Sequence, residues 1–257
     1  MASEVHDLFE RDGCVVVRDV VPAAEIVALR DLFMTIIPEI PYPPGADGVV
    51  RELTGLARGY PPAMAVATDA RFGALVAEVL GARRVQLLQD SWLYKPPHHG
   101  GSVELHQDRT YIGFLVPARV ATLRIALERE DETNGCMRAV DGSHRWGAIG
   151  DDRSLVAQSV TSLVPTLSAD QQASVGNARS LPLQPGDVSI HHCLTLHGSS
   201  RNTSARPRRT IILRMFDAAC VIDRARLPAG ADAFFPADED GHLDIAAFPV
   251  VCEPGPG

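Results

Sequence analysis

Hydrophobic positions in the first part of the chain recur at helical spacing around one short strand. The pattern predicts a helix over residues 4–10, a strand over residues 14–17, and a longer helix after Val21 with Pro22 in its first turn. One side of this longer helix carries its apolar residues: Ile26, Leu29, Leu32 and Phe33. The beginning of the chain is therefore expected to be mainly helical.

A further helix is predicted over residues 70–80, where Gly81 supplies the left-handed residue that ends many helices. The segment between the helices, residues 38–66, is rich in proline and glycine. Such composition predicts a long loop, here with a single helical turn. Long ordered loops in compact domains often serve function.

From Arg84 onward the pattern changes to short runs of β-forming residues separated by turn signals. The predicted strands are VQLLQDSWLYK, TLRIALER, CMRAV, DVSIHH and RTIILRMF. One helix is expected within residues 166–179, because Ser168 and Gln171 have the spacing of a capping box. Helices followed by returning strands predict an α+β fold with a barrel or sandwich core.

The whole chain, residues 1–257, is expected to form a single domain. Its helical N-terminal part spans about residues 1–83, its barrel core about residues 84–217, and its C-terminal loop or tail residues 218–257. The tail is rich in proline, glycine and aspartate and is expected to cover the barrel.

Composition narrows the classes of partner. A net charge of −8 disfavours nucleic-acid binding, which needs clustered positive charge. The sequence has neither an apolar secretion signal nor a run long enough to cross a membrane, so no membrane partner is expected. Five widely spaced cysteines without a C-x-x-C pair indicate a reducing compartment, and we expect a cytoplasmic protein. No signal indicates the oligomeric state.

Three histidines lie within the segment HHCLTLHGSS, residues 191–200. In an unbroken strand, alternation places His191 and His197 on one face and His192 on the other. A turn inside the run would reset this pattern. His191 and His192 therefore cannot chelate one metal from a regular strand, whereas His191 and His197 both stay eligible.

The segment ELHQDRTY offers partners for such a histidine. His106 and Asp108, at positions i and i+2, would project from the same side of an extended segment. Two imidazoles and one carboxylate form the facial triad that holds Fe(II) and leaves positions open for a co-substrate and O₂. The H-x-D motif alone is weak, because two polar loop residues match it often.

Arg208 follows His197 by eleven positions, at the start of an apolar run. A strand returning antiparallel there would bring its guanidinium beside the metal, where it suits the far carboxylate of a dicarboxylate. Ser199 could add a hydroxyl to the same carboxylate. Alternation separates Arg208 from Arg209, so at most one of them faces the interior, and we expect it to be Arg208. The alternative for Arg201, Arg206, Arg208 and Arg209 is a solvated basic turn.

Taken together, several segments in this order resemble the phytanoyl-CoA dioxygenase family of Fe(II)- and 2-oxoglutarate-dependent oxygenases. The segments are FERDGCVVVRDVV, LYKPP, LHQD, TNGCMRAVDGSHRWG, QPGDVSIHH, LHGSSRN and PRR. The resemblance implies a double-stranded β-helix (jelly-roll) core flanked by helices. It also implies the iron ligands His106, Asp108 and His197, with Arg208 and Ser199 on the far carboxylate of 2-oxoglutarate.

The resemblance further implies that Gln89, Ser91 and Leu93 face cofactor and substrate, and alternation independently places these three on one face. Arg124 matches a position bordering 2-oxoglutarate, where it would bind the co-substrate, hold an anionic substrate or form a salt bridge. His192 would line the substrate pocket or make a buried hydrogen bond.

The implied cofactors are Fe(II), 2-oxoglutarate and O₂, and the implied reaction is oxidation of an unactivated C–H bond with release of succinate and CO₂. The expected outcome is hydroxylation of a small molecule, with a secondary metabolite as the favoured substrate class. Oxidative cyclisation, epimerisation and desaturation remain open alternatives, as does a metal-binding barrel without turnover. Residues 38–66, residues 147–180 and the tail after Asp217 are expected to form the pocket mouth.

Overall fold

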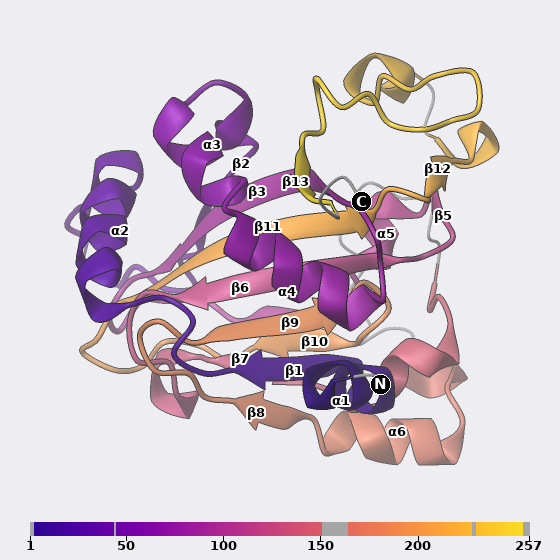
Figure 1. The fold of residues 1–257 in the computed structure, drawn as a ribbon. Helices are drawn as coiled ribbons and strands as arrows, with labels where there is room; N and C mark the ends of the chain where they lie inside the picture. Colours follow the sequence, from indigo (N-terminus) through magenta and orange to yellow (C-terminus); the bar gives the residue numbers. More distant parts are fainter. Residues whose placement is uncertain (1–2, 44, 151–163, 228–229, 254–257) are drawn as a thin grey trace.

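The computed structural model of the chain describes residues 3–43, 45–150, 164–227 and 230–253 (Figure 1). Its centre is an antiparallel sheet in the order β1-β9-β6-β11-β3-β13, with β2 also pairing with β3. These strands are β1 (Cys14–Val17), β2 (Arg51–Thr54), β3 (Val85–Lys95), β6 (Val120–Ala126), β9 (Val188–His192), β11 (Arg208–Asp217) and β13 (Val250–Cys252). We call it the major sheet.

A smaller sheet, the minor sheet, has the order β4-β10-β7-β8. Its strands are β4 (Val103–His106), β7 (Met137–Ala139), β8 (Arg179–Leu181) and β10 (His197–Ser199). A third pair joins β5 (Leu115–Val116) to β12 (Val221–Ile222). The major and minor sheets form the walls of a double-stranded β-helix, the jelly-roll fold predicted from the sequence.

Helices cover the outer face of the major sheet (Figure 1). They are α1 (Glu4–Asp12), α2 (Ala23–Ile36), α3 (Pro61–Ala67) and α4 (Ala70–Leu80). Their buried side chains pack on the outward residues of the strands; Phe33 of α2, for example, contacts Trp92 of β3 at 5.6 Å between ring centroids. Burial of this apolar surface is the main stabilising contribution to the fold.

The remaining helical elements lie in the connections. They are η1 (Leu56–Arg58), α5 (Arg109–Ile112), η2 (Glu132–Asn134), η3 (Ser143–Trp146), η5 (Val164–Thr166), α6 (Ala169–Gly176), η6 (Arg224–Arg226) and η7 (Ala231–Phe234). The predicted capping box at α6 is confirmed, because Ser168 and Gln171 exchange side-chain-to-backbone hydrogen bonds. Every helix in the described ranges is too short or too polar to cross a bilayer.

Alternation decides which side chains of β3 and β11 face the helices and which face the barrel. Trp92 and Tyr94 lie in the helix-covered core, whereas Gln89, Ser91 and Leu93 line the interior. The two strands pair from Arg208 opposite Lys95 to Asp217 opposite Val85, with a register shift between Arg214 and Met215. The shift leaves Leu88 as an extra residue on β3, so Leu88 also points inward beside Gln89.

Two expectations about the organisation need correction. Residues 38–66 are not a loop with one helical turn, because they contain strand β2, the 3-10 helix η1 and helix α3. The barrel also extends beyond the expected bounds of 84–217, because the predicted strand β1 and the unpredicted strands β2 and β13 join the major sheet. Of the expected pocket-mouth segment 147–180, residues 151–163 lie outside the described residues.

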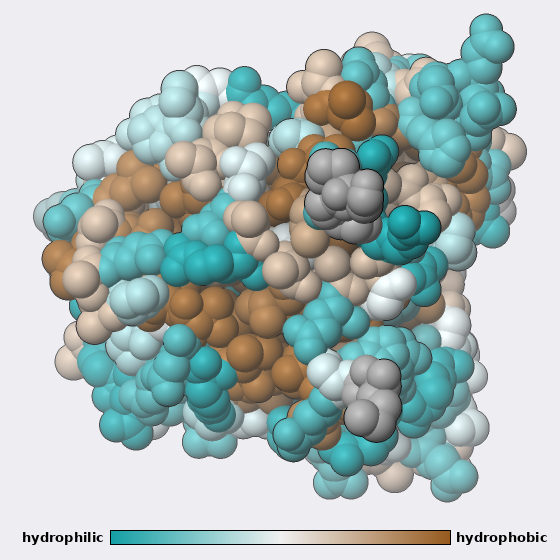
Figure 2. All heavy atoms as spheres, in the orientation of Figure 1, coloured by the Kyte–Doolittle hydropathy of each residue, from teal (hydrophilic) through white to brown (hydrophobic). Residues whose placement is uncertain are grey.

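The outer surface is mixed. Figure 2 shows hydrophobic side chains gathered across the middle of one face, with hydrophilic side chains around them. Phe234 and Ile245 are among the most exposed large hydrophobic residues, and both belong to the segment after β12.

Candidate metal centre and co-substrate site

Three predicted ligands meet where β4 and β10 pair. His106 ends β4, His197 begins β10, and the two residues are register partners. Asp108 follows at the start of α5, and the ligand atoms of all three residues lie within 4.8 Å of one another. The sequence predicted an extended segment from His106 to Asp108, but Asp108 has helical backbone angles, φ −60° and ψ −25°. The tight turn into α5 therefore brings the three residues together.

The two histidines are held in the tautomer that metal binding requires. Nδ1 of His106 lies 2.9 Å from the carbonyl oxygen of Glu104, and Nδ1 of His197 lies 2.9 Å from that of Thr195. Each ring therefore donates from Nδ1 and directs the lone pair of Nε2 toward Asp108. The Nε2 atoms lie 3.8 and 3.9 Å from Oδ1 of Asp108, too far for good hydrogen bonds but suitable for ligands that share a cation.

Asp108 is buried and fixed by three neighbours. Thr122 Oγ1 donates to its Oδ2 at 2.6 Å, His191 Nε2 lies 3.2 Å from the same oxygen, and Arg214 Nη2 donates to Oδ1 at 3.1 Å. Burial would raise the pKa of Asp108, but Arg214 and His191 outweigh it and hold the pKa well below its usual range. The carboxylate is therefore ionised and available to a metal.

Burial and the neighbouring rings of His191 and His106 lower the pKa of His197 well below its usual value. A neutral imidazole is the form that binds a metal ion, so the environment favours the ligand state. A divalent cation fits this donor set of two imidazoles and one carboxylate.

His191 and His192 point in opposite directions, as alternation predicts within β9. His191 faces the barrel, its ring 4.0 Å from that of His197. His192 packs against Phe9 and His144, with centroid distances of 6.1 and 5.8 Å, and accepts a hydrogen bond from the backbone N–H of Leu194. Of the two roles expected for His192, pocket lining is therefore wrong, because its ring lies on the helix-covered side; the buried hydrogen bond is present.

A cationic cluster lies further along the barrel. Arg208, at the start of β11, faces inward and contacts buried Glu130 at 3.4 Å, the Gly135 carbonyl and Thr210. Arg124 of β6 donates to the same Glu130 at 3.2 Å. Arg209 points to the other face of the sheet and pairs with Glu128 at 2.5 Å. Arg208 and Arg209 therefore lie on opposite faces of β11, as alternation predicts.

Lys95 completes this cluster, and sequence reasoning gave it no role. It is fully buried, and its Nζ donates to Oγ of Ser199 and to the carbonyl oxygen of Ser200, both at 2.7 Å. Burial, Arg208 and Arg124 together lower the pKa of Lys95 to about 6. A signal was present, because alternation continues from Gln89 through Ser91 and Leu93 to Lys95.

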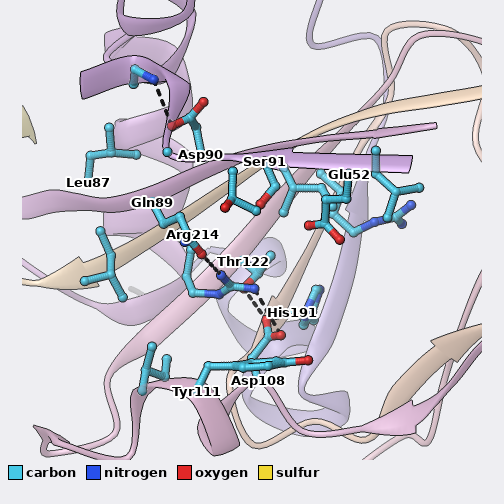
Figure 3. Close-up of a pocket in the computed structure, with 18 of the residues that line it drawn as sticks. Glu52, Leu87, Gln89, Asp90, Ser91, Asp108, Tyr111, Thr122, His191 and Arg214 are labelled. Carbon is cyan, nitrogen blue, oxygen red and sulfur yellow. Dashed lines mark hydrogen bonds and ion pairs between the residues drawn. The ribbon is translucent and has the colours of Figure 1, made fainter. Parts of the chain in front are cut away.

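The metal triad, Arg124 and Arg208 line a cavity of about 970 Å³ (Figure 3). The predicted residues that line it are Gln89, Ser91, Leu93, His106, Asp108, Arg124, His197, Ser199 and Arg208. The cavity is also lined by residues that sequence reasoning did not place there, among them Arg214 and Tyr111. Figure 3 shows Arg214 between Gln89 and Asp108, with its guanidinium joined to both.

Comparison with known protein families assigns the chain to one of them. The family model for phytanoyl-CoA dioxygenase (PhyH) matches residues 9–210. The chain belongs to the phytanoyl-CoA dioxygenase family. The match runs from α1 to β11 and so includes every predicted metal ligand and Arg208 of this family member.

Curated proteins that are similar to this chain include phytanoyl-CoA dioxygenases. Phytanoyl-CoA dioxygenase of Arabidopsis thaliana is 30% identical over 172 residues, 62% of this chain and 56% of that protein. The peroxisomal phytanoyl-CoA dioxygenase of Bos taurus is 26% identical over 239 residues, 86% of this chain and 70% of that protein. The chain spans about half the length of the first curated relatives it matches.

Solved structures share the fold at lower identity. The epimerase SnoN, in complex with Fe³⁺, α-ketoglutarate and a nogalamycin compound, has a TM-score of 0.76 at 22% identity, covering 96% of this chain and 97% of SnoN. The carbocyclase SnoK has a TM-score of 0.75 at 21% identity, with 98% and 97% covered. EctD from S. alaskensis has a TM-score of 0.71 at 19% identity, covering 99% of this chain and 86% of EctD.

Proposed function

We propose that this member of the phytanoyl-CoA dioxygenase family is an Fe(II)- and 2-oxoglutarate-dependent oxygenase that oxidises an unactivated C–H bond of a small-molecule substrate. The observation that carries the proposal is the triad of His106, Asp108 and His197, whose ligand atoms lie within 4.8 Å. Their Nδ1 hydrogen bonds and the contacts to Asp108 orient all three toward one point. The triad leaves coordination positions for a co-substrate and O₂.

The cationic cluster supports 2-oxoglutarate as the co-substrate. Arg208 and Ser199 line the same cavity as the triad, and a guanidinium binds a carboxylate with paired hydrogen bonds. A bound carboxylate would favour the ammonium form of Lys95, which donates to Oγ of Ser199 and cannot accept, so the hydroxyl proton of Ser199 would point into the cavity. Arg208 and Ser199 would then bind the far carboxylate while the keto acid faces the metal.

Arg124 fits a supporting role in this arrangement. It shares buried Glu130 with Arg208, so two guanidinium groups compensate one carboxylate and the cluster keeps surplus positive charge. An incoming carboxylate would balance that surplus. Of the roles expected for Arg124, the salt bridge is present, and its charge also favours the co-substrate.

Iron, 2-oxoglutarate and O₂ together supply a C–H oxidation that releases succinate and CO₂. The protein's part is to hold the ligands, orient the co-substrate and enclose the reacting group in the cavity. Hydroxylation is the proposed outcome. Cyclisation, epimerisation and desaturation would need the same residues. Among the structural neighbours SnoN is an epimerase and SnoK a carbocyclase, so the fold accommodates the first two outcomes.

Anaerobic titration tests the proposal directly. Adding Fe(II) and 2-oxoglutarate to the wild-type protein should produce the weak visible charge-transfer band of a keto acid chelated to Fe(II). Asp108→Ala should lose iron and the band, because it removes the anionic ligand. Arg208→Ala should keep iron but need more 2-oxoglutarate to form the band, by about 10- to 100-fold.

Two results would contradict the proposal. One is the absence of the band in wild-type protein that has bound iron. The other is a normal band in Asp108→Ala, which would place the metal on another carboxylate. Loss of iron in Arg208→Ala with unchanged co-substrate affinity would refute the role of Arg208 alone.

A further inference from the structure

We propose that Arg214 anchors the substrate through a carboxylate, so that the enzyme acts on an organic acid with an apolar body. The inference rests on the proposed function, because it concerns the substrate end of the same cavity. Arg214 lies on β11 and lines the cavity beside the metal ligands, at the opposite end of β11 from Arg208.

The guanidinium of Arg214 has donors to spare. Its Nη1 donates to Oε1 of Gln89 at 2.6 Å and its Nη2 to Oδ1 of Asp108 at 3.1 Å. Its Nε is buried without a hydrogen-bond partner among the described residues and is not open to the cavity. Each Nη nitrogen carries a second N–H beyond the one that these acceptors use, and these N–H groups can serve a ligand in the cavity.

The charge of Arg214 also lacks a dedicated counterion. Its only ion pair among the described residues is with Asp108, through the oxygen that faces the histidines. Once a divalent cation is bound, the negative charge of Asp108 is shared with that cation, and the metal repels the guanidinium. A buried charge without a partner is costly.

Other acids of the cavity do not supply this partner. Asp90 turns away and accepts from the backbone of Ala57 and from Trp92 Nε1. Glu52 is exposed and acts on Arg214 only through its charge, without an ion pair in the described part of the chain. An anionic group on the substrate would therefore be the direct partner that the remaining Nη N–H groups of Arg214 lack.

The rest of this end of the cavity is suited to an apolar body. Its hydrophobic lining comes from α3, β3, α5 and η7 and the residue after it: Met64, Leu88, Ile112, Phe234 and Phe235. A cavity of about 970 Å³ has room for a drug-sized molecule. The carboxylate on Arg214 would hold such a molecule with its adjoining carbon atoms next to the metal triad.

Paired probes that differ only in charge test the inference. The series of phenyl-substituted alkanoic acids from phenylacetate to 6-phenylhexanoate, with the primary amide of each, is titrated calorimetrically into anaerobic protein loaded with Fe(II) and 2-oxoglutarate. The best acid should bind wild-type protein at least about tenfold more tightly than its amide. Arg214→Gln should reduce this preference to less than about threefold, and Arg214→Lys should keep part of it.

Arg84→Gln is the matched control, because it removes the same charge from an exposed position that pairs with Glu253. It should keep the wild-type preference. The charge-transfer band is measured in every variant. Because Arg214 also donates to Asp108, Arg214→Gln is compared with the wild type at Fe(II) and 2-oxoglutarate concentrations that give each protein its full band. A missing band in the wild type would mean failure of the proposed function, whereas a normal band without acid preference means failure of this inference alone.

Two results overturn the inference. The first is that no acid in the series binds the loaded wild-type protein more tightly than its amide. The second is that the preference survives in fully loaded Arg214→Gln, because Arg214 would then only support Asp108 and would not anchor the substrate.

Discussion

Lys95 Nζ donates a hydrogen bond of 2.7 Å to Ser199 Oγ, deep inside the barrel. The two residues come from different sheets, β3 of the major sheet and β10 of the minor sheet. Lys95 is the only lysine of the chain, and its amino group contacts the hydroxyl that we assign to the co-substrate. This contact links the sheet that carries Arg208 to the strand that carries His197.

Replacing Lys95 by methionine should weaken 2-oxoglutarate binding by about tenfold, because Ser199 loses a charge-assisted hydrogen bond and the cluster loses a cation. Iron binding should stay at the wild-type level, since Lys95 contacts none of the metal ligands. Both constants come from anaerobic titration, the second followed through the charge-transfer band. Unchanged 2-oxoglutarate affinity would show that Lys95 has only a packing role.

The pH dependence of 2-oxoglutarate binding should follow the protonation of Lys95. Its pKa of about 6 in the free protein means that the side chain is mostly neutral above that pH. A nearby carboxylate favours the ammonium form, so binding takes up a proton and the dissociation constant rises with pH. We expect a rise of up to about tenfold per pH unit immediately above pH 6.

Lys95→Met provides the comparison for this pH profile, because all other titrating groups stay in place. Its dissociation constant should rise less steeply than that of the wild type over the same range. Parallel profiles for the two proteins would assign the proton uptake to another group.

His191→Phe should weaken iron binding by about 10- to 100-fold, because the ring no longer contacts Oδ2 of Asp108 and the carboxylate is less firmly oriented. The adjacent change His192→Phe is the matched control, since that ring faces the helix-covered core. It should leave iron affinity at the wild-type value. Equal losses in both variants would mean that disturbance of β9, and not the contact to Asp108, is responsible.

His192 should contribute to the acid sensitivity of the fold. Burial first, and then the charge of His144, lower its pKa to about 4, so the folded protein holds it neutral. This contribution to stability is fully present above the unfolded value near pH 6.5 and is lost as the pH falls toward 4.

Between pH 7 and pH 5 we expect His192 to account for about 2 kcal/mol of the lost unfolding free energy. Urea unfolding of wild type and His192→Phe at both values measures this. The variant should lose less stability on acidification than the wild type. The same loss in both proteins would show that other buried histidines dominate.

Much of the fold was predictable because its main strands have clear alternation. The inward positions of Gln89, Ser91 and Leu93, and the opposite orientations of Arg208 and Arg209, follow from the period of a strand alone. Helices α2 and α4 follow from their apolar faces, and α4 ends at Gly81 as expected. Local sequence patterns predict a structural feature well when that feature depends only on neighbouring residues in the chain.

Other features depend on contacts between distant segments. The proline-rich segment forms β2 because β3 offers an edge for pairing, which no local pattern indicates. Likewise, β13 is only three residues long and is defined by its partner β3. The turn after His192 interrupts the alternation predicted through His197, although His191 and His197 still meet.

The site residues that sequence reasoning missed share this cause. Arg214 lies on the same face of β11 as Arg208, but its importance comes from Asp108 on α5 and Gln89 on β3. Glu130 lies between β6 and η2, outside any strand, and becomes a charge partner only when Arg124 and Arg208 converge on it. Chain-distant pairings of this kind need coordinates.

Because its single lysine is buried, the folded protein should react little with reagents that acylate lysine side chains. Lys95 has no exposed surface, so acylating reagents meet no lysine side chain on the outside of the folded molecule. Any label found on Lys95 must have entered while the barrel wall was open. The rate of that labelling therefore measures how often the interior opens to solvent, and no engineered probe is needed.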